Sequence, residues 1–95
     1  MSSHINWDVS TRDFSIIEQI ADRAVVMARQ HRIQWTKQDF MMDVTAVYNR
    51  DGLRLADLLA ADDFNFAHDI LGIRRHLNRD TGKLSQFVPR FARFQ

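Results

Sequence analysis

The chain has 95 residues, of which 13 are Lys or Arg and 12 are Asp or Glu, and 45% of the residues are hydrophobic. A chain of this length provides one modest hydrophobic core, so we expect a single domain. The absence of cysteine excludes disulfide bonds, thiolate metal sites and cysteine nucleophiles. No apolar run approaches the roughly 20 residues that cross a bilayer, and the first residues do not resemble a signal peptide, so we expect a cytoplasmic protein without membrane contact.

The near-neutral total hides an uneven distribution of charge. Residues 74–95 contain six basic residues and one acidic residue, a net charge of +5, whereas residues 1–73 contain seven basic and eleven acidic residues, a net charge of −4. Phenylalanines alternate with arginines near the end of the basic segment. A segment that offers both positive charge and flat apolar surface favours an acidic partner.

The first predicted helix spans residues 11–30. Ser10, with Asp13 three residues later, forms an approximate capping box that begins this helix. Projection at 100° per residue places the apolar residues in an arc about 180° wide. An arc of this width should contact two other elements.

A second helix is predicted over residues 37–49. Thr36 and Asp39 have the spacing of a capping box and mark its beginning. The Asp51-Gly52 pair ends it, because glycine after the last turn readily takes the left-handed conformation that closes a helix.

Two further helices are predicted over residues 54–61 and 64–78. The first is short, and either Asp62 or Asp63 caps the second. The following turn contains Gly82, which can take the positive φ that such a loop needs. Residues 84–95 show no helical period and contain a proline, so we expect an extended C-terminal arm. The predicted fold class is therefore all-α, a compact orthogonal bundle of about four helices with this arm.

Four histidines raise the question of a metal site, but their spacing argues against one. His68 and His76 are separated by a rise of about 12 Å on the predicted helix, which is too far for one ion with ligand distances of about 2 Å. Only His76 and Asp80 have a spacing of four, and they straddle a helix end. The chain also lacks a Gly-rich phosphate loop and a Gly-x-Ser-x-Gly motif. We expect no metal, no cofactor and no catalytic residue.

Asp39 and Asp43 form a carboxylate pair, four residues apart on the second predicted helix. Such a pair serves acid–base catalysis only if burial separates the two pKa values. Both residues lie near the edge of the polar face, so we expect a solvated surface pair rather than a catalytic dyad.

Arg74 falls within the apolar arc of the predicted helix over residues 64–78, where a guanidinium needs a partner. One interpretation is a buried or half-buried ion pair with an aspartate, for which Asp43 and Asp62 are candidates. The alternative is that this part of the arc is a binding face and not core. The sequence leaves both open.

His68, Arg75 and Arg79 align within about 40° on the polar side of the same predicted helix. A solvated face is the ordinary interpretation of such a basic stripe. The alternative is that the stripe belongs to a surface that binds a partner.

The helices over residues 54–61 and 64–78 also resemble a helix-turn-helix, with the basic stripe facing phosphates. The N-terminal end of a recognition helix lies deepest in the major groove, and here that end is acidic. The acidic residues are Asp62, Asp63 and Asp69. They leave only Asn65 to read bases, so nucleic-acid binding is the alternative function and not the main one.

The C-terminal phenylalanines have two interpretations. Exposed phenylalanines promote aggregation, so such side chains are more often plugs that return to the core than stacking platforms. The residues concerned are Phe87, Phe91 and Phe94.

These observations together predict a non-enzymatic protein that docks an acidic protein partner through a basic helix face and a basic, aromatic tail. The residues expected to bind this partner are His68, Arg75, Arg79, Lys83, Arg90 and Arg93. Neither the identity of the partner nor the oligomeric state can be predicted from the sequence.

Residues 58–84, with the sequence LLAADDFNFAHDILGIRRHLNRDTGKL, are followed by the run Pro89-Arg90-Phe91-Ala92. This stretch resembles a family of small uncharacterised proteins encoded by tailed bacteriophages and prophages, and the likeness spans most of the chain from about Asp8. The resemblance implies a bacterial host cytoplasm and an accessory protein that binds and redirects a host or phage protein. It implies no activity, cofactor or catalytic residue.

Overall fold

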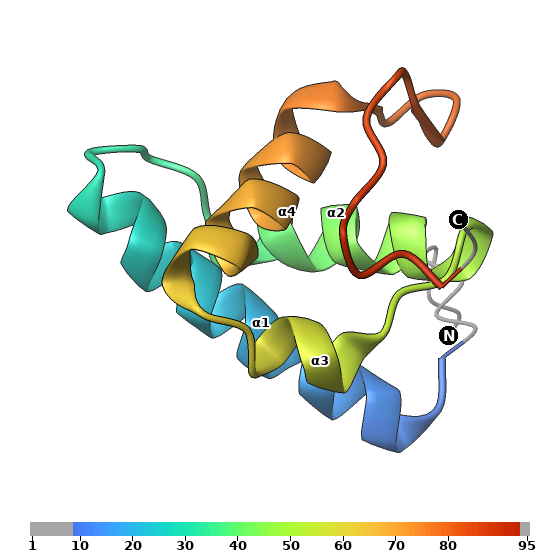
Figure 1. Cartoon of the computed structure of the whole chain (residues 1–95), viewed down its shortest axis with the longest axis horizontal. Coiled ribbons are helices and arrows are strands. Elements are labelled where there is room, and N and C mark those ends of the chain that lie inside the picture. Colours follow the sequence, from blue (N-terminus) through green and yellow to red (C-terminus); the bar gives the residue numbers. More distant parts are fainter. Residues whose placement is uncertain (1–8, 94–95) are drawn as a thin grey trace.

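The computed structural model describes residues 9–93. Its helices are α1 (Thr11–Gln30), α2 (Lys37–Arg50), α3 (Leu55–Leu59) and α4 (Asp63–His76), and its two short strands are β1 (Leu77–Asn78) and β2 (Lys83–Leu84). α1 and α2 pack against each other, α3 lies against α1, and α4 packs mainly on α2. In the view of Figure 1, α4 runs at a steep angle to α1. The fold is mostly helical, and none of these four helices is both long and apolar enough to span a bilayer.

The predicted N-caps of the two long helices are confirmed. The Ser10 side chain accepts a hydrogen bond from the N–H of Asp13 at 3.1 Å. Thr36 and Asp39 form a complete capping box, in which each side chain accepts a hydrogen bond from the backbone N–H of the other residue. A helix begins at these positions because a side-chain oxygen satisfies an N–H group that has no partner within the helix.

The second half of the chain differs from the prediction in detail. α3 is shorter than expected, because Ala61 donates to the carbonyl of Leu58 in a tight turn instead of continuing the helix. Asp62 then caps α4 by accepting a hydrogen bond from the N–H of Asn65. α4 ends at His76, two residues earlier than predicted, since Leu77 adopts an extended backbone.

A hairpin of two short strands, each two residues long, follows α4, so the fold is not strictly all-α. Leu77 pairs with Leu84, and Asn78 pairs with Lys83, in antiparallel register. Gly82 has the predicted positive φ, at 68°. The hairpin redirects the chain so that the residues after β2 return towards the helices.

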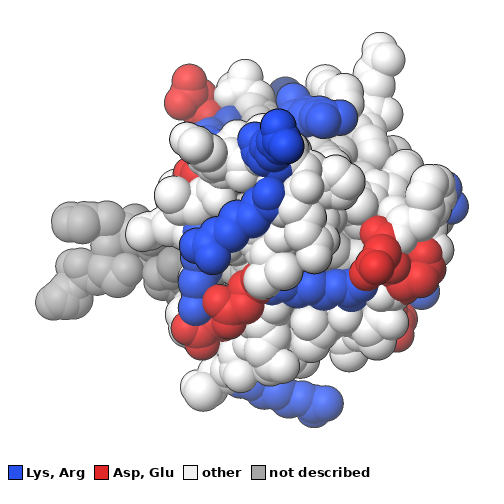
Figure 2. Space-filling view, turned by 90° about the vertical axis from the view of Figure 1, so that its left-hand side faces the viewer, with Lys and Arg blue, Asp and Glu red and all other residues white. Residues whose placement is uncertain are grey.

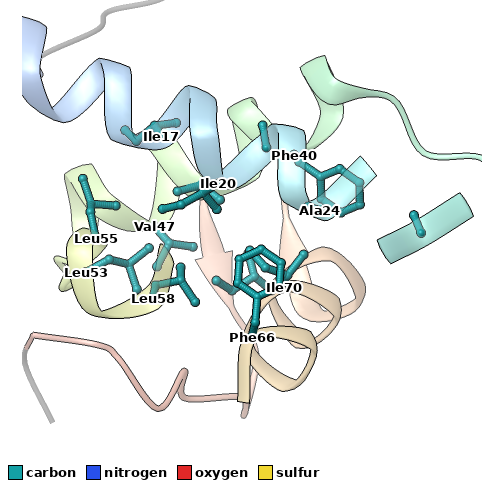
Figure 3. Packing of buried hydrophobic residues seen from close by; sticks show 14 residues of the cluster. Ile17, Ile20, Ala24, Phe40, Val47, Leu53, Leu55, Leu58, Phe66 and Ile70 are labelled. Carbon is teal, nitrogen blue, oxygen red and sulfur yellow. The ribbon is translucent and has the colours of Figure 1, made fainter. Parts of the chain in front are cut away.

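Buried side chains from all four helices form one core (Figure 3). Ile20 of α1 lies above Phe66 and Ile70 of α4, whereas Ile17 lies on the side of Leu55 of α3, with side chains of α2 around them. The largest fully buried side chains of these other segments are Phe40, Val44, Val47, Leu53 and Leu58. The wide apolar arc of α1 therefore contacts more than one element, as predicted from its width.

The predicted extended arm is not confirmed, because residues 85–93 lie against the rest of the protein. Ala92 forms an isolated antiparallel bridge with Leu53, and the N–H of Arg54 donates to the carbonyl of Phe91 at 2.9 Å. Phe87 and Phe91 pack against the core, which confirms their interpretation as plugs. Phe94, the third predicted plug, lies outside the described residues.

Candidate functional site

The structure does not bring together all six of the residues that were expected to bind a partner. His68 and Arg75 lie on α4, His68 half-buried and Arg75 exposed. Lys83 is exposed on β2, and Arg93 is exposed near the end of the described chain. Arg93 lines a hollow of about 210 Å³ that also contains Arg12 and Arg54 and is built around α1 and α3, not α4. The six residues therefore do not form one continuous basic patch.

Arg79 is removed from the predicted basic stripe. It lies in the turn after β1, because α4 ends at His76, and its guanidinium reaches back to α2. Nε and one terminal nitrogen donate to the same carboxylate oxygen of Asp43, at 3.0 and 2.8 Å. The charge of Arg79 is thus neutralised within the molecule.

Arg74 joins the same ion-pair cluster from α4. Its guanidinium lies 3.3 Å from Asp43 and 3.6 Å from Asp39, and it also stands over the ring of Trp35 at 5.0 Å. The predicted ion pair with Asp43 is confirmed, whereas the other candidate, Asp62, serves as the cap of α4. The interpretation of Arg74 as part of a binding face is therefore wrong.

The prediction of a solvated Asp39 and Asp43 pair is wrong for Asp43, which is only 2% exposed. Burial raises the pKa of Asp43 to about 6, because loss of hydration disfavours the charged carboxylate more than Arg79 stabilises it. The Asp43 carboxylate is nevertheless covered by two guanidinium groups. This arrangement is a structural cluster that joins α2 to α4, not a dyad open to a substrate.

The solvent side of α4 carries a surface that the sequence did not predict as a whole. Phe64 is 70% exposed and shares its angle on α4 with His68 and Arg75. Val88, next to Phe87 in the C-terminal segment, is 59% exposed. Arg90 lies over the ring of Phe64 at 5.9 Å, so one predicted basic residue does reach this region.

A hollow of about 340 Å³ occupies this side of α4. The residues that line it, which we call the α4 surface, are Phe64, Ala67, His68, Leu71, Gly72, Arg75, His76 and Phe87. None of these eight residues is acidic. The surface therefore combines one exposed phenylalanine and several half-buried apolar residues with the positive charge of Arg75, and none of its lining residues is a carboxylate.

Phe87 forms one wall of the α4 surface and is held between two histidines. Its ring stacks on His76, with ring centres 5.5 Å apart and planes 9° apart, and it lies 5.3 Å from the ring of His68. The same ring lies directly over Gly72, in the space that a Cβ atom there would occupy. Glycine in α4 thus allows the C-terminal segment to approach the helix closely.

The side chain of Asp69 anchors the C-terminal segment to α4. Its side chain is 0% exposed, and its two oxygens accept hydrogen bonds from the N–H groups of Arg90 and Phe91 at 2.8 and 3.0 Å. His68 also lies 3.0 Å from this carboxylate. The sequence placed Asp69 among the acids that would repel phosphate, but this burial shows that it is not part of the outer surface.

The acidic part of the chain carries its own basic partners. Arg23 pairs with Asp63 at 2.9 Å, and Lys37 lies 3.1 Å from both Glu18 and Asp22. Figure 2 shows acidic groups next to basic side chains on one face of the molecule. The separation of charge along the sequence is therefore only partly kept in space. Within residues 9–93, no group of three or more His, Asp or Glu side chains could hold a metal ion.

These features define the class of protein, a small and mostly helical fold with an apolar and basic surface on α4 whose lining residues include no carboxylate. The chain belongs to the family DUF6874, described as a family of unknown function, whose model matches residues 12–93. No curated protein and no solved structure matches the chain. Membership in this family says nothing about phages, so a phage origin remains an expectation from the sequence.

Proposed function

We propose that the chain is a non-enzymatic binding protein that docks an acidic protein partner on the α4 surface. The single observation that supports this proposal is the composition of that surface, where the exposed Phe64, half-buried apolar residues and Arg75 lie together and no lining residue is a carboxylate. Buried apolar anchors and arginines contribute most of the energy of protein interfaces. A partner that places carboxylates opposite Arg75 would complement the charge.

The proposed binding residues are fewer than the sequence suggested. His68, Arg75 and Arg90 remain, Phe64 and Phe87 are added as apolar anchors, and Arg79 is left out because Asp43 neutralises it. The partner would be a host or phage protein in a bacterial cytoplasm, as the resemblance implies, and binding would modulate its action. The α4 surface itself carries no information on whether the partner comes from a host or a phage.

Nucleic-acid binding is the second candidate, since the same arginines could contact phosphates. A side-chain hydrogen bond of Asn65 argues against DNA binding through a helix-turn-helix. Its side-chain nitrogen donates to Asp62 at 2.6 Å, so the one residue expected to read bases is held against the cap of its own helix. α3 also has only five residues.

Capture from a bacterial lysate tests the main proposal. Immobilised wild-type protein is compared with Phe64→Glu, Arg75→Glu and, as a control for charge on another helix, Arg29→Glu. We expect proteins that bind the wild type and the control but not the two α4 variants. An identical set of captured proteins for all four would overturn the proposal. Binding to labelled DNA or RNA that weakens steeply with added salt would favour the second candidate instead.

A further inference from the structure

Three arginines from distant parts of the chain line one hollow beside α1 and α3. Arg12 belongs to the first turn of α1, Arg54 directly precedes α3, and Arg93 lies near the end of the C-terminal segment. The volume of this hollow is about 210 Å³, and none of its lining residues belongs to the α4 surface. It is therefore a second and separate feature of the molecule.

Backbone pairing places two of these arginines on the same face. Leu53 and Ala92 form an antiparallel bridge, and the N–H groups of Arg54 and Arg93 donate across it at 2.9 and 3.2 Å. Leu53 and Ala92 are buried. Because side chains alternate along paired backbone, Arg54 and Arg93 both point to the other face, in diagonal positions that are about 7–8 Å apart in such a pair. The chain thus brings two guanidinium groups to the hollow through ordinary strand geometry.

Two carboxylates also line the hollow, and each has a partner of its own. The hydroxyl of Tyr48 donates a hydrogen bond to Asp13. The carboxylate of Asp57 lies 3.5 Å from the guanidinium of Arg54. These two acidic groups therefore leave the other two arginines without a counter-charge.

Arg12 and Arg93 are exposed, and neither forms an ion pair in the part of the chain that the structure describes. Two unpaired positive charges thus face one small hollow. Like charges that gather without a counter-charge repel each other, and an anion bound between them converts this repulsion into attraction. The hollow therefore favours an anion.

A phosphate group matches this hollow better than a carboxylate does. A phosphate monoester carries a charge of about −1.5 to −2 at pH 7 and has three strong acceptor oxygens, so it can meet guanidinium groups from several directions. A carboxylate has a single charge and two oxygens in one plane, which satisfy one arginine fork. The volume of about 210 Å³ is also below the roughly 300–1,000 Å³ of clefts for larger ligands, so a small group fits.

We propose that this hollow binds the phosphate group of a small anion through Arg12, Arg54 and Arg93. Free inorganic phosphate and a small phosphate monoester offer the same chemistry to these residues. The guanidinium of Arg54 is already held in place, because it donates to the carbonyl of Arg90 at 2.9 Å and lies over the ring of Phe91 at 5.3 Å. This inference goes beyond the proposed function and does not depend on it, since the two sites share no residue.

Titration of the isotope-labelled protein with inorganic phosphate, followed by NMR of the backbone amides, tests the site. At neutral pH the amides of the residues that line the hollow should shift and reach saturation at millimolar phosphate. Sodium chloride at the same ionic strength should produce much smaller shifts, because screening acts on all exposed charges alike. No saturable shift, or shifts spread evenly over the exposed arginines of the molecule, would refute the site.

Two further anions identify the ligand. Glycerol 2-phosphate should bind as tightly as inorganic phosphate if the hollow accepts a monoester, and much more weakly if it accepts only the free ion. Acetate should bind about tenfold or more weakly than phosphate, because it offers one charge and two oxygens. Acetate binding as tight as that of phosphate would contradict the assignment of a phosphate group.

Arg12→Gln and Arg93→Gln test the two unpaired charges. Each should weaken phosphate binding about tenfold, because each removes a charge-assisted hydrogen bond to the anion. Arg29→Gln, which changes an exposed arginine in the last turn of α1, is the matched control and should bind phosphate like the wild type. Neither Arg12 nor Arg93 has an ion pair to lose, so both variants should fold, and their amide spectra verify this. Unchanged phosphate affinity in both variants would refute the proposal.

Discussion

The ring of Phe87 occupies the space directly over the backbone of Gly72, so that α4 and the C-terminal segment meet without a side chain between them. Gly72 lies inside α4, where glycine costs helix stability of about 1 kcal/mol relative to alanine. The contact with Phe87, and the stacking of this ring on His76, compensate for that cost.

The first prediction follows from this contact. Gly72→Ala should destabilise the protein by about 1–3 kcal/mol despite its better helix propensity, because the added methyl group overlaps the Phe87 ring and must displace it. Urea denaturation followed by circular dichroism measures the free energy of unfolding. The matched control makes the same change in a Phe87→Ala background, where the overlap is absent and Gly72→Ala should stabilise by about 0.5–1 kcal/mol. Equal effects in both backgrounds would show that Phe87 does not rest on Gly72.

The second prediction concerns Asp69, whose side chain holds the C-terminal segment against α4. Asp69→Asn keeps the shape of the side chain but replaces one accepting oxygen with a donor, so either the Arg90 or the Phe91 N–H loses its partner. We expect a loss of about 1–3 kcal/mol, together with faster hydrogen exchange of the amides in residues 87–92. The exposed Asp80→Asn is the control and should change neither quantity. Unchanged exchange in the Asp69→Asn variant would contradict the role of Asp69 as an anchor.

The caps could be predicted from the sequence because their physics is local. Ser10 and Thr36 each bond to a residue three positions away, so the pattern that begins a helix is visible in a few letters. The end of α4 could not be predicted in the same way. It depends on the pairing of Leu77 and Asn78 with residues beyond the turn, and this pairing competes with continued helix.

The candidate site was predicted less well, because its residues take partners that are distant in sequence. Arg79 continues the line of His68 and Arg75 on a helical projection, but the chain leaves the helix before Arg79 and delivers it to Asp43, 36 residues away. Hydrophobicity alone predicts that Phe64 belongs to the core. Its angle on the helix, which it shares with His68 and Arg75, is the signal that places it on the outer surface.

The third prediction tests the ion-pair cluster between α2 and α4. Arg79→Met retains much of the side chain but removes both hydrogen bonds to Asp43, and should cost about 1–3 kcal/mol in the free energy of unfolding at neutral pH. Arg75→Met, on the exposed side of α4, is the matched control and should remain within about 0.5 kcal/mol of the wild type. Losses of equal size for the two variants would show that Arg79 makes no special contribution.

The fourth prediction follows from the pKa of Asp43, which burial raises from its ordinary 3.8 to about 6 in the folded protein. Between these two pH values the folded state binds a proton that the unfolded state has lost. The contribution of this group to stability is therefore fully present below about pH 4 and is lost as the pH rises through 6. A shift of about two pKa units corresponds to about 3 kcal/mol.

The stability of wild type minus that of Asp43→Asn, measured by urea denaturation at several pH values, isolates this contribution from other titrating groups. This stability difference should fall by about 3 kcal/mol as the pH rises from below about 4 to above about 6. A constant difference in stability between the two proteins does not affect this result. The cost of Arg79→Met should change in the opposite direction and grow as the pH rises from about 4.5 to about 7.5, because only the ionised Asp43 needs the guanidinium as a partner. A cost of Arg79→Met that does not change over this range would mean that Asp43 is ionised throughout. In that case the two arginines, and not burial, would control its charge.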